Sequence, residues 1–544
     1  MTRSWAALSG WFDAVVLDLG RQMRWSFLPP LMVYFAYGAS GITSVVGTFF
    51  VKDYLDVSAA FLAGLGFWVG LPWALKMPMG HLVDLMWRWK WLLVFIGAGL
   101  IAASFVIMFG LATRVGWMAG VMPVTAWFVL ASLLSPTGYV LQDAVADALS
   151  VEAVPKVDES SHPLDETTVR AQHTTMQTLG RVALIGALSA VAALNISLFA
   201  GIEDLPEAAK GAVYGRIYLM GLAIPVISVS GVLLAKWQQR RQIAEMIAQG
   251  LSRPQAEAHF APEGGAVKPN WSYFIGGGIF VAISITLGLS DIPYAQEMIF
   301  AGSLAIVLYL MRQLLAVLEP AKARALIGTA IIIFVFRATP LPGAGATWFT
   351  IDELGFDPQF IAVLELITSV LTLAGMFVLR PLMANHTIVY IVVLLSLASG
   401  LLSLPNIGLF YGIQNWTAPL TGGIVDARFI AILDTTMESP LGQVAMIPML
   451  AWIARNAPDS LKATFFAVMA SFTNLALSAS SLGTKYLNQI FTVTREVTAP
   501  DGKVQIPADY HQLGLLLITV AGIGLVVPLI AAALVQRSRL HTTD

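Results

Sequence analysis

Long apolar runs constrain this chain more than any other feature of its sequence. Runs of mostly apolar residues, typically about 20 residues long, recur along its whole length. They lie at residues 28–51, 59–80, 91–112, 120–149, 172–200, 212–235, 271–290, 296–317, 323–339, 358–379, 386–404, 421–454, 462–487 and 509–535. A helix of this length crosses about 30 Å of hydrocarbon. The pattern predicts an all-α, polytopic membrane protein with about 14 spans.

The composition agrees with this class. Charged residues make up 12% of the chain, whereas soluble proteins contain about 25%. The net charge of -2 gives no reason to expect a nucleic-acid partner. The chain has no cysteine, and its histidines lack metal-ligand spacing. No phosphate-binding loop of the G-x-x-x-x-G-K-[ST] type occurs either. We therefore expect no metal, no cofactor and no enzymatic activity, and a lipid bilayer as the surroundings.

The distribution of Lys and Arg orients the predicted spans. If the N-terminus is cytoplasmic and every run spans, most Lys and Arg outside the runs fall on the cytoplasmic side, as the positive-inside rule requires. Both termini are then expected in the cytoplasm. Charged residues interrupt the N-terminal segment, which lacks the pattern of a secretory signal. This indicates a multi-pass protein of the bacterial inner (plasma) membrane.

Two long connections divide the chain. One follows the sixth run, is basic and is rich in proline and glycine, which predicts a linker. The other, before the last run, predicts an external hairpin-like loop. Two six-helix halves around a central site, with two accessory helices between them, explain this division. The expected segments are a cytoplasmic or interfacial N-terminus at 1–27, a first half at 28–235, a cytoplasmic linker at 236–270, accessory helices at 271–317, a second half at 318–537 and a cytoplasmic tail at 538–544.

Carboxylates at the end of the fourth run mark a candidate functional site. Ionised side chains in hydrocarbon are costly, so they usually face a water-filled cavity or a charged partner. Asp143 and Asp147 are four residues apart and project from one face of a helix. They are candidates for a coupling proton, or for a purely structural bridge between Asp147 and Arg181, the nearest basic residue in sequence. Glu152, nearer the cytoplasm, is expected to be solvated.

A basic residue in the second run is the next candidate. Lys76 lies between Pro72 and Pro78. Prolines kink a span and free backbone carbonyls, as is typical near binding sites. The alternative is that Lys76 extends to the cytoplasmic surface, because the run ends soon afterwards.

The second half holds a further polar set. Glu365 lies well inside its run, where an unpaired ionised carboxylate costs several kcal/mol or more, so we expect it to be protonated or paired. Arg337 ends an apolar run and is either an external anchor or a cavity residue. Asp434 and Glu438 share a helix face, which we expect to face the aspartate-bearing helix of the first half across a cavity. Arg428, earlier in the same run, belongs either to that cavity or to its external entrance.

Several motifs resemble those of the folate–biopterin transporter family of the major facilitator superfamily. The most specific is Gln142-Asp143-Ala-Val-Ala146-Asp147-Ala148-Leu149. Others are Lys52-Asp53-Tyr-Leu55, Pro72-Trp73-Ala-Leu-Lys76, Phe336-Arg-Ala-Thr339-Pro340, Asp352-Glu353-Leu354-Gly355-Phe356 and Met446-Ile-Pro448. In the predicted turn after the second span, Gly80, Asp84 and Arg88 also resemble the gating loop of the superfamily, G-x-x-x-D-x-x-x-R/K.

The resemblance implies a fold of major-facilitator type and a proton-coupled secondary active transporter that imports folate- or pterin-like compounds by alternating access. Such a protein is expected to be a monomer whose partners are its substrate and protons. Lys76, Arg181 and Arg428 would contact carboxylates, and Trp73 would stack on a flat ring. The remaining candidate proton or substrate groups are Asp143, Asp147, Arg337, Glu365, Asp434 and Glu438. Two alternatives are a carrier for another organic anion or amphipathic solute, and a non-transporting membrane assembly factor with the same fold.

Overall fold

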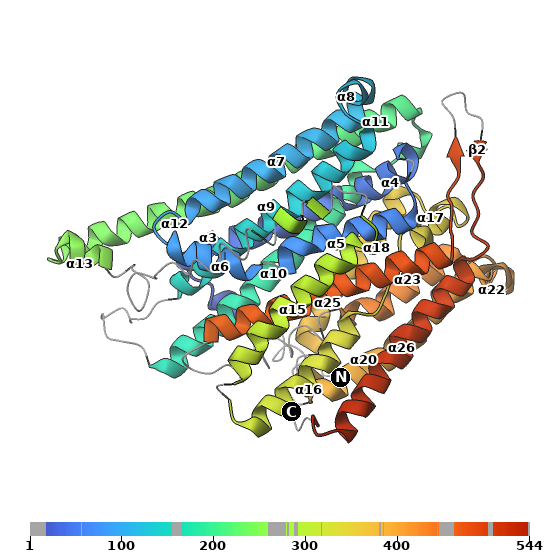
Figure 1. Cartoon of the computed structure of the whole chain (residues 1–544). Helices are drawn as coiled ribbons and strands as arrows, with labels where there is room; N and C mark the ends of the chain where they lie inside the picture. Colours follow the sequence, from blue (N-terminus) through green and yellow to red (C-terminus); the bar gives the residue numbers. More distant parts are fainter. Residues whose placement is uncertain are drawn as a thin grey trace, which may run out of the picture.

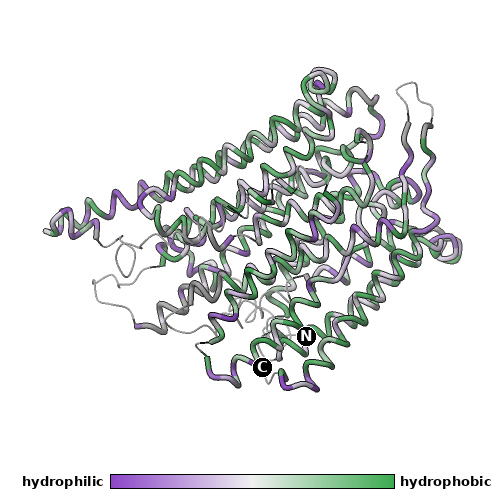
Figure 2. Tube along the Cα trace, in the orientation of Figure 1, coloured by the Kyte–Doolittle hydropathy of each residue, from purple (hydrophilic) through white to green (hydrophobic). Residues whose placement is uncertain are grey.

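The structure is a bundle of long helices (Figure 1). It is a computed structural model of the whole chain. The residues that it describes are 18–55, 57–74, 76–154, 165–258, 260, 279, 282–284, 286–287, 292–316, 318–379, 382–383, 386–442, 444, 462–498 and 504–541. Among them, nine segments are long and apolar enough to cross a membrane. Hydrophobic residues cover most of the length of these helices, and hydrophilic residues gather toward the ends of the bundle (Figure 2).

The first group of helices runs from α2 to α12. Its elements are α2 (Asp18–Arg21), η2 (Trp25–Phe27), α3 (Leu28–Ala39), η3 (Ser40–Thr43), α4 (Ser44–Tyr54), α5 (Ala59–Ala74), α6 (Lys76–Leu85), α7 (Trp91–Thr113), α8 (Val115–Val121), α9 (Val124–Ala153), α10 (Glu166–Leu198), η4 (Ile202–Asp204), α11 (Glu207–Gly221) and α12 (Ala223–Ala248). Helix α12 continues into the predicted linker, which also contains α13 (Arg253–Ala258).

The second group follows α15 (Ala295–Leu315). Its elements are α16 (Pro320–Arg337), α17 (Ala344–Asp352), α18 (Pro358–Val378), α20 (Ile388–Leu402), α21 (Leu404–Phe410), α22 (Gln414–Leu420), α23 (Ala427–Glu438), η5 (Ser439–Leu441), α25 (Lys462–Ile490), β1 (Val497–Thr498), β2 (Val504–Ile506) and α26 (Leu513–Arg537). Within the described residues, the apolar runs coincide with helices. Most of the run at 271–290 and the end of the run at 421–454, with Met446-Ile-Pro448, lie outside the described residues. The all-α prediction is confirmed, with one short hairpin added.

That hairpin confirms the hairpin-like form of the loop predicted before the last span. Strands β1 and β2 pair antiparallel, with Val497 opposite Ile506. The predicted turn at Asp501 and Gly502 lies outside the described residues. We call this end of the bundle, which also carries α8, α17 and α22 in Figure 1, the hairpin end.

Two seams join the groups. Within each group, helices pack on their neighbours, for example α7 on α9 and α3 on α10 in the first group, and α20 on α26 in the second. Between the groups, α5 and α6 pack against α25, and α10 packs against α18. Helix α15 lies along α25. Helices distant in sequence therefore form both seams.

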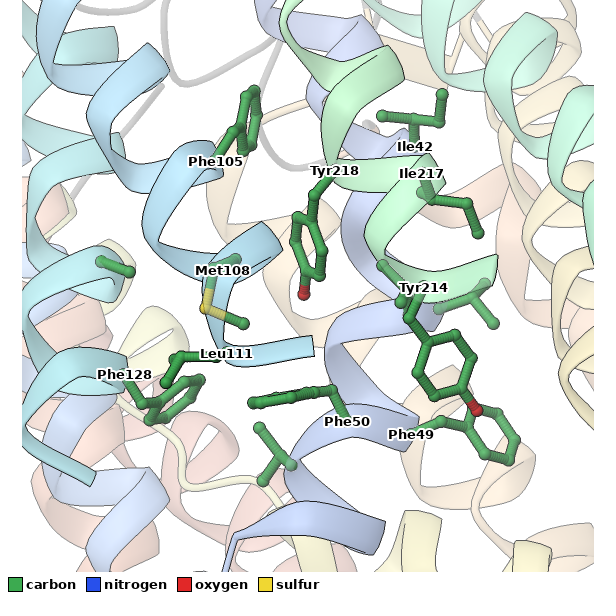
Figure 3. Packing of buried hydrophobic residues seen from close by; sticks show 14 of the residues in the cluster. Ile42, Phe49, Phe50, Phe105, Met108, Leu111, Phe128, Tyr214, Ile217 and Tyr218 are labelled. Atoms are coloured by element: carbon green, nitrogen blue, oxygen red, sulfur yellow. The ribbon is translucent and has the colours of Figure 1, made fainter. Parts of the chain in front are cut away.

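A close crossing of α7 and α9 organises the first group. A Cβ atom on Gly97 would lie 2.6 Å from the carbonyl oxygen of Gly138, so only glycine allows this approach. Toward the hairpin end, side chains from α4, α7, α9 and α11 point toward one another in one apolar core (Figure 3). Phe50 and Tyr214 are fully buried there. This packing fixes the position of α9, which carries Asp143 and Asp147.

Candidate functional site

Three helices meet at one ion-paired cluster in the first group. The Lys76 ammonium, at the start of α6, pairs with Asp143 and lies 2.7 Å from Oδ2 of Asp147. Both aspartates project from α9. From α3, the Tyr34 hydroxyl donates a hydrogen bond of 2.7 Å to Oδ1 of Asp147. The cluster of Tyr34, Lys76, Asp143 and Asp147 is called the carboxylate cluster below.

Local sequence explains this geometry. The four-residue spacing places Asp143 and Asp147 one turn apart on α9. The neighbouring Gln142 faces α7 instead, where its side chain donates to the carbonyl oxygen of Val94 at 3.2 Å. Pro72 lies inside α5 and removes one backbone hydrogen bond, and a second helix, α6, begins at Lys76. The Lys76 side chain therefore points to Asp143 and Asp147 inside the bundle and does not extend to the membrane surface.

Aromatic rings lie beside the cluster. The ring of Tyr37 is 5.5 Å from Trp73 and 5.1 Å from Tyr139, between ring centroids. Tyr139 is buried, and its hydroxyl lies close to the side chains of Ser40 and Ser135. The carbonyl oxygen of Trp73 accepts a hydrogen bond of 3.2 Å from Asn474 of α25. The aromatic side chains therefore stand next to a seam between the two helix groups.

Arg181 of α10 is a second basic residue near the carboxylate cluster. It is close enough to interact electrostatically with Asp143 and with Tyr37. Within the described part of the chain it forms no ion pair or hydrogen bond, so Asp147 is bridged to Lys76 and not to Arg181. The exposed fraction of the side chain is 16% for Asp143 and 47% for Asp147. Asp147 is thus the more accessible carboxylate.

A second carboxylate pair lies on α23. Asp434 is buried, and its Oδ2 accepts a hydrogen bond of 2.7 Å from Asn406 of α21. Its Oδ1 has no hydrogen-bond partner among the described residues. Glu438 lies one turn further, is exposed, and interacts electrostatically with Asp434. Helix α23 packs mainly on α18 and α21.

Three other candidates lie apart from these clusters. Arg428 lies 2.6 Å from Oδ2 of Asp357, the residue that caps the start of α18. The Arg337 Nε donates to the carbonyl oxygen of Thr473 at 3.2 Å. Glu365 of α18 accepts a hydrogen bond of 2.9 Å from the hydroxyl of Ser44 on α4. This last contact joins the two helix groups.

The turn between α6 and α7 contains the gating candidates. Around Gly80 there is open space, and the Asp84 side chain lies outside the described residues. Arg88 is exposed and 3.9 Å from Glu257. Lys90 is buried instead, 2.6 Å from Glu152. Glu152 is exposed, as expected, but it is also ion-paired, because the end of α9 packs beside this turn.

Several polar side chains of these sites were not predicted from the sequence. Tyr34, Tyr37 and Tyr139 contribute hydroxyls and rings, and Asn406 holds Asp434. A usable signal was present for the tyrosines. Tyr34 and Tyr37 are three residues apart, and Tyr139 is four residues before Asp143, which places each on a helix face with another polar group. Asn406 gave no such signal.

Two sequence comparisons find relatives of this chain. The BT1 family matches over residues 218–543. The chain is 23% identical over 474 residues to a folate-biopterin transporter of Synechocystis sp., covering 84% of this chain and 74% of that protein. It is 25% identical over 167 residues to the putative folate transporter 2 of Plasmodium berghei, covering 30% of this chain and 34% of that protein.

Solved structures resemble the fold. A POT family transporter in complex with a thioalcohol-conjugated peptide superposes with a TM-score of 0.58 at 13% identity, covering 97% of both chains. A variant of the nucleoside transporter NupG gives 0.54 at 12% identity, covering 94% of this chain and 99% of that one. At these identities the likeness shows the fold alone, and it confirms the predicted architecture of major-facilitator type.

Proposed function

This chain belongs to the BT1 family, the folate–biopterin transporter family, and from this premise we propose that it is a proton-coupled secondary active transporter. It imports folate- or pterin-like compounds by alternating access. The observation that carries the proposal is the carboxylate cluster, in which one ammonium and two carboxylates meet inside membrane-spanning helices beside aromatic rings. Charged groups at this depth are costly and therefore rare, and where they occur they usually mark a functional site.

The helix packing supports alternating access. Residues 28–235 and 318–537 form the two six-helix halves, with the linker at 236–270 and accessory helices at 271–317 between them. Helices within each half pack on one another, and the halves meet along the α5–α25 and α10–α18 seams. Rocking of one half against the other along these seams would expose a central site to each side in turn. The active unit is a monomer in the bacterial inner membrane with both termini cytoplasmic.

The chemistry of the first site suits a flat, anionic heterocycle. Tyr37 and Trp73 provide rings for stacking. Arg181, which has no ion-pair partner among the described residues, and Lys76 provide positive charge for a carboxylate. Asp143 can accept hydrogen bonds from N–H groups on the edge of a ring.

The charge balance of the site supports proton coupling. Lys76 and Arg181 together balance Asp143 and Asp147, so the empty site is neutral when all four are ionised. An anionic substrate then brings a surplus negative charge into a region of low dielectric, where it is costly. Protonation of one carboxylate cancels that charge. Asp147 is the more accessible of the two, so it is our candidate for the proton carrier.

The second half supplies further groups. Asp434 and Glu438 form a second acidic site. Their electrostatic interaction supports it, as does Oδ1 of Asp434, which accepts no hydrogen bond from the residues that the structure describes. Arg428 belongs to the external entrance, because Asp357 holds it beside the start of α18. Arg337 contacts the backbone of α25 at a seam. Gly80, Asp84 and Arg88 form the cytoplasmic gating turn.

Uptake of labelled folate into proteoliposomes tests the proposal. With an inward proton gradient we expect accumulation that an ionophore abolishes. Asp147→Asn keeps an acceptor for Tyr34 and removes the charge, so the folded protein should lose most gradient-driven accumulation, roughly tenfold or more. Glu245→Gln is the control, because Glu245 is an exposed acidic residue that pairs within α12.

The outcomes separate the alternatives. Unchanged accumulation by Asp147→Asn would remove Asp147 from coupling. No folate uptake by folded protein, with uptake of another pterin or organic anion, would keep the transporter and change the substrate. Absence of transport for the whole panel, together with a stable protein partner, would favour an assembly factor.

A further inference from the structure

Two family motifs that the transport site does not use meet at the hairpin end. Lys52 lies at the end of α4, in the first half, and Asp352 ends α17, in the second half. The Lys52 ammonium is 2.6 Å from Oδ1 of Asp352, and the exposed fractions of the two side chains are 14% and 18%. This ion pair therefore bridges the halves from a largely buried position.

Tyr510 reinforces the bridge. It precedes α26, and its hydroxyl donates a hydrogen bond to Oδ2 of Asp352. Burial and the neighbouring Asp352 carboxylate raise the pKa of Tyr510, so the hydroxyl stays protonated and remains a donor. Both oxygens of Asp352 are thus occupied, one by each half.

The hairpin adds a second bridge. Arg495, which precedes β1 and is 7% exposed, donates a hydrogen bond to the carbonyl oxygen of Leu55, where α4 ends. Its guanidinium also lies 5.9 Å from the ring centroid of Trp348 on α17. Trp348 belongs to a buried apolar cluster that contains Ala59 of the first half and Val493 of the second. Polar bridges and apolar packing close the same end.

The ion pairs near the other end differ. Lys76 pairs with Asp143 and Asp147, and Lys90 pairs with Glu152. Both partners lie in the first half in each case, so these pairs need not break when the halves separate. The Lys52–Asp352 pair must break.

We propose that Lys52, Asp352, Tyr510 and Arg495 form a latch that holds the hairpin end closed in this conformation and opens in each transport cycle. The inference rests on the alternating access proposed above and deepens it, because it names the contact that controls access from one side. When the halves part, water hydrates both charges. Removing the Lys52 charge takes away the ion-pair partner of the largely buried Asp352 carboxylate, which destabilises the closed state relative to the open one.

The absence of cysteine makes a direct test simple. Glu203 of η4 and Leu420 of α22 are exposed at the hairpin end, one in each half, and each can be changed to cysteine for spin labelling. Pulsed EPR on the full chain in nanodiscs, without substrate or gradient, then reports the separation of the halves. We expect one short-distance population for the parent protein. Lys52→Gln should raise the ratio of long to short distances about tenfold.

Matched variants keep the test decisive. The exchange of Lys52→Asp with Asp352→Lys restores opposite charges and should restore the short distance, and Tyr510→Phe should cause a smaller shift than Lys52→Gln. Arg241→Gln is the control, because Arg241 pairs within α12. If Lys52→Gln, Asp352→Asn and Tyr510→Phe all keep the parent distances, the latch is wrong. The readout needs no substrate, so a failure to transport folate leaves this result intact.

Discussion

At the scale of single residues, Lys76 is the most constrained side chain of the candidate site. Its ammonium serves two carboxylates, and its own exposed fraction is 25%. This partly buried cation lies between two acidic partners. Loss of the cation would leave two negative charges close together, and they would repel each other. At this position, the residue proposed to serve transport is therefore also expected to stabilise the fold.

Lys76→Met tests that coupling. The variant keeps the apolar stem and removes the charge, and we expect a loss of about 2–4 kcal/mol in the free energy of unfolding. Thermal unfolding of the purified protein in detergent at neutral pH measures it. Adding Asp143→Asn removes one stranded charge and should recover part of the loss. Equal melting temperatures for the parent and Lys76→Met would show that the pair does not stabilise the fold.

At the scale of elements, the crossing of α7 and α9 positions the aspartates. Gly97 and Gly138 let the two backbones touch, and Gln142 adds a buried hydrogen bond to the same contact. Neither glycine needs unusual backbone angles here. They are required because a side chain would push the helices apart.

Two substitutions on α7 separate packing from helix propensity. Gly97→Ala places a Cβ 2.6 Å from the carbonyl oxygen of Gly138, and we expect a destabilisation of about 1–3 kcal/mol. Gly99→Ala meets no atom within 4 Å, so the better helix propensity of alanine should leave stability equal or slightly higher. Melting temperatures in one detergent compare them. A similar change for both variants would contradict the role of the crossing.

At the scale of the whole molecule, contacts between helices distant in sequence join the halves. The α5–α25 and α10–α18 seams run between them. Helix α15 contacts both α5 and α25. Gln296 donates to the carbonyl oxygen of Gly64 on α5, and Glu297 pairs with Lys485 on α25. The Ser44–Glu365 hydrogen bond is the corresponding polar contact between α4 and α18. In the proposed alternating-access cycle, movement of the halves would change all of these contacts together.

Glu365→Gln tests whether this contact also carries a proton. The amide oxygen still accepts from Ser44, so the fold should be retained, while the group can no longer titrate. We expect gradient-driven accumulation to fall several-fold and substrate exchange without a gradient to persist. Ser44→Ala is the matched control, since it removes the hydrogen bond and keeps the carboxyl group. Loss of both activities in Glu365→Gln would indicate a structural role instead.

The sequence by itself determined the class, the spans and the family. Apolar runs of membrane length permit only helices, because backbone groups in hydrocarbon need internal hydrogen bonds. Motif residues such as Asp143 and Asp147 identified the family because they are close together in the sequence, so their spacing can be read without a structure. The hairpin before α26 was predictable for the same reason.

Only the tertiary structure decided which charges meet. Lys76 and Asp143 are 67 residues apart, and the sequence left open a bridge between Asp147 and Arg181 instead. Lys52 and Asp352 were motif residues without a role until α4 and α17 came together. Long side chains reach about 6 Å, so pairing depends on the rotation and tilt of each helix, which are set by packing such as the Gly97–Gly138 crossing. Long apolar runs in the sequence determine which helices cross the membrane, whereas packing against neighbouring helices determines the direction in which their charged side chains point.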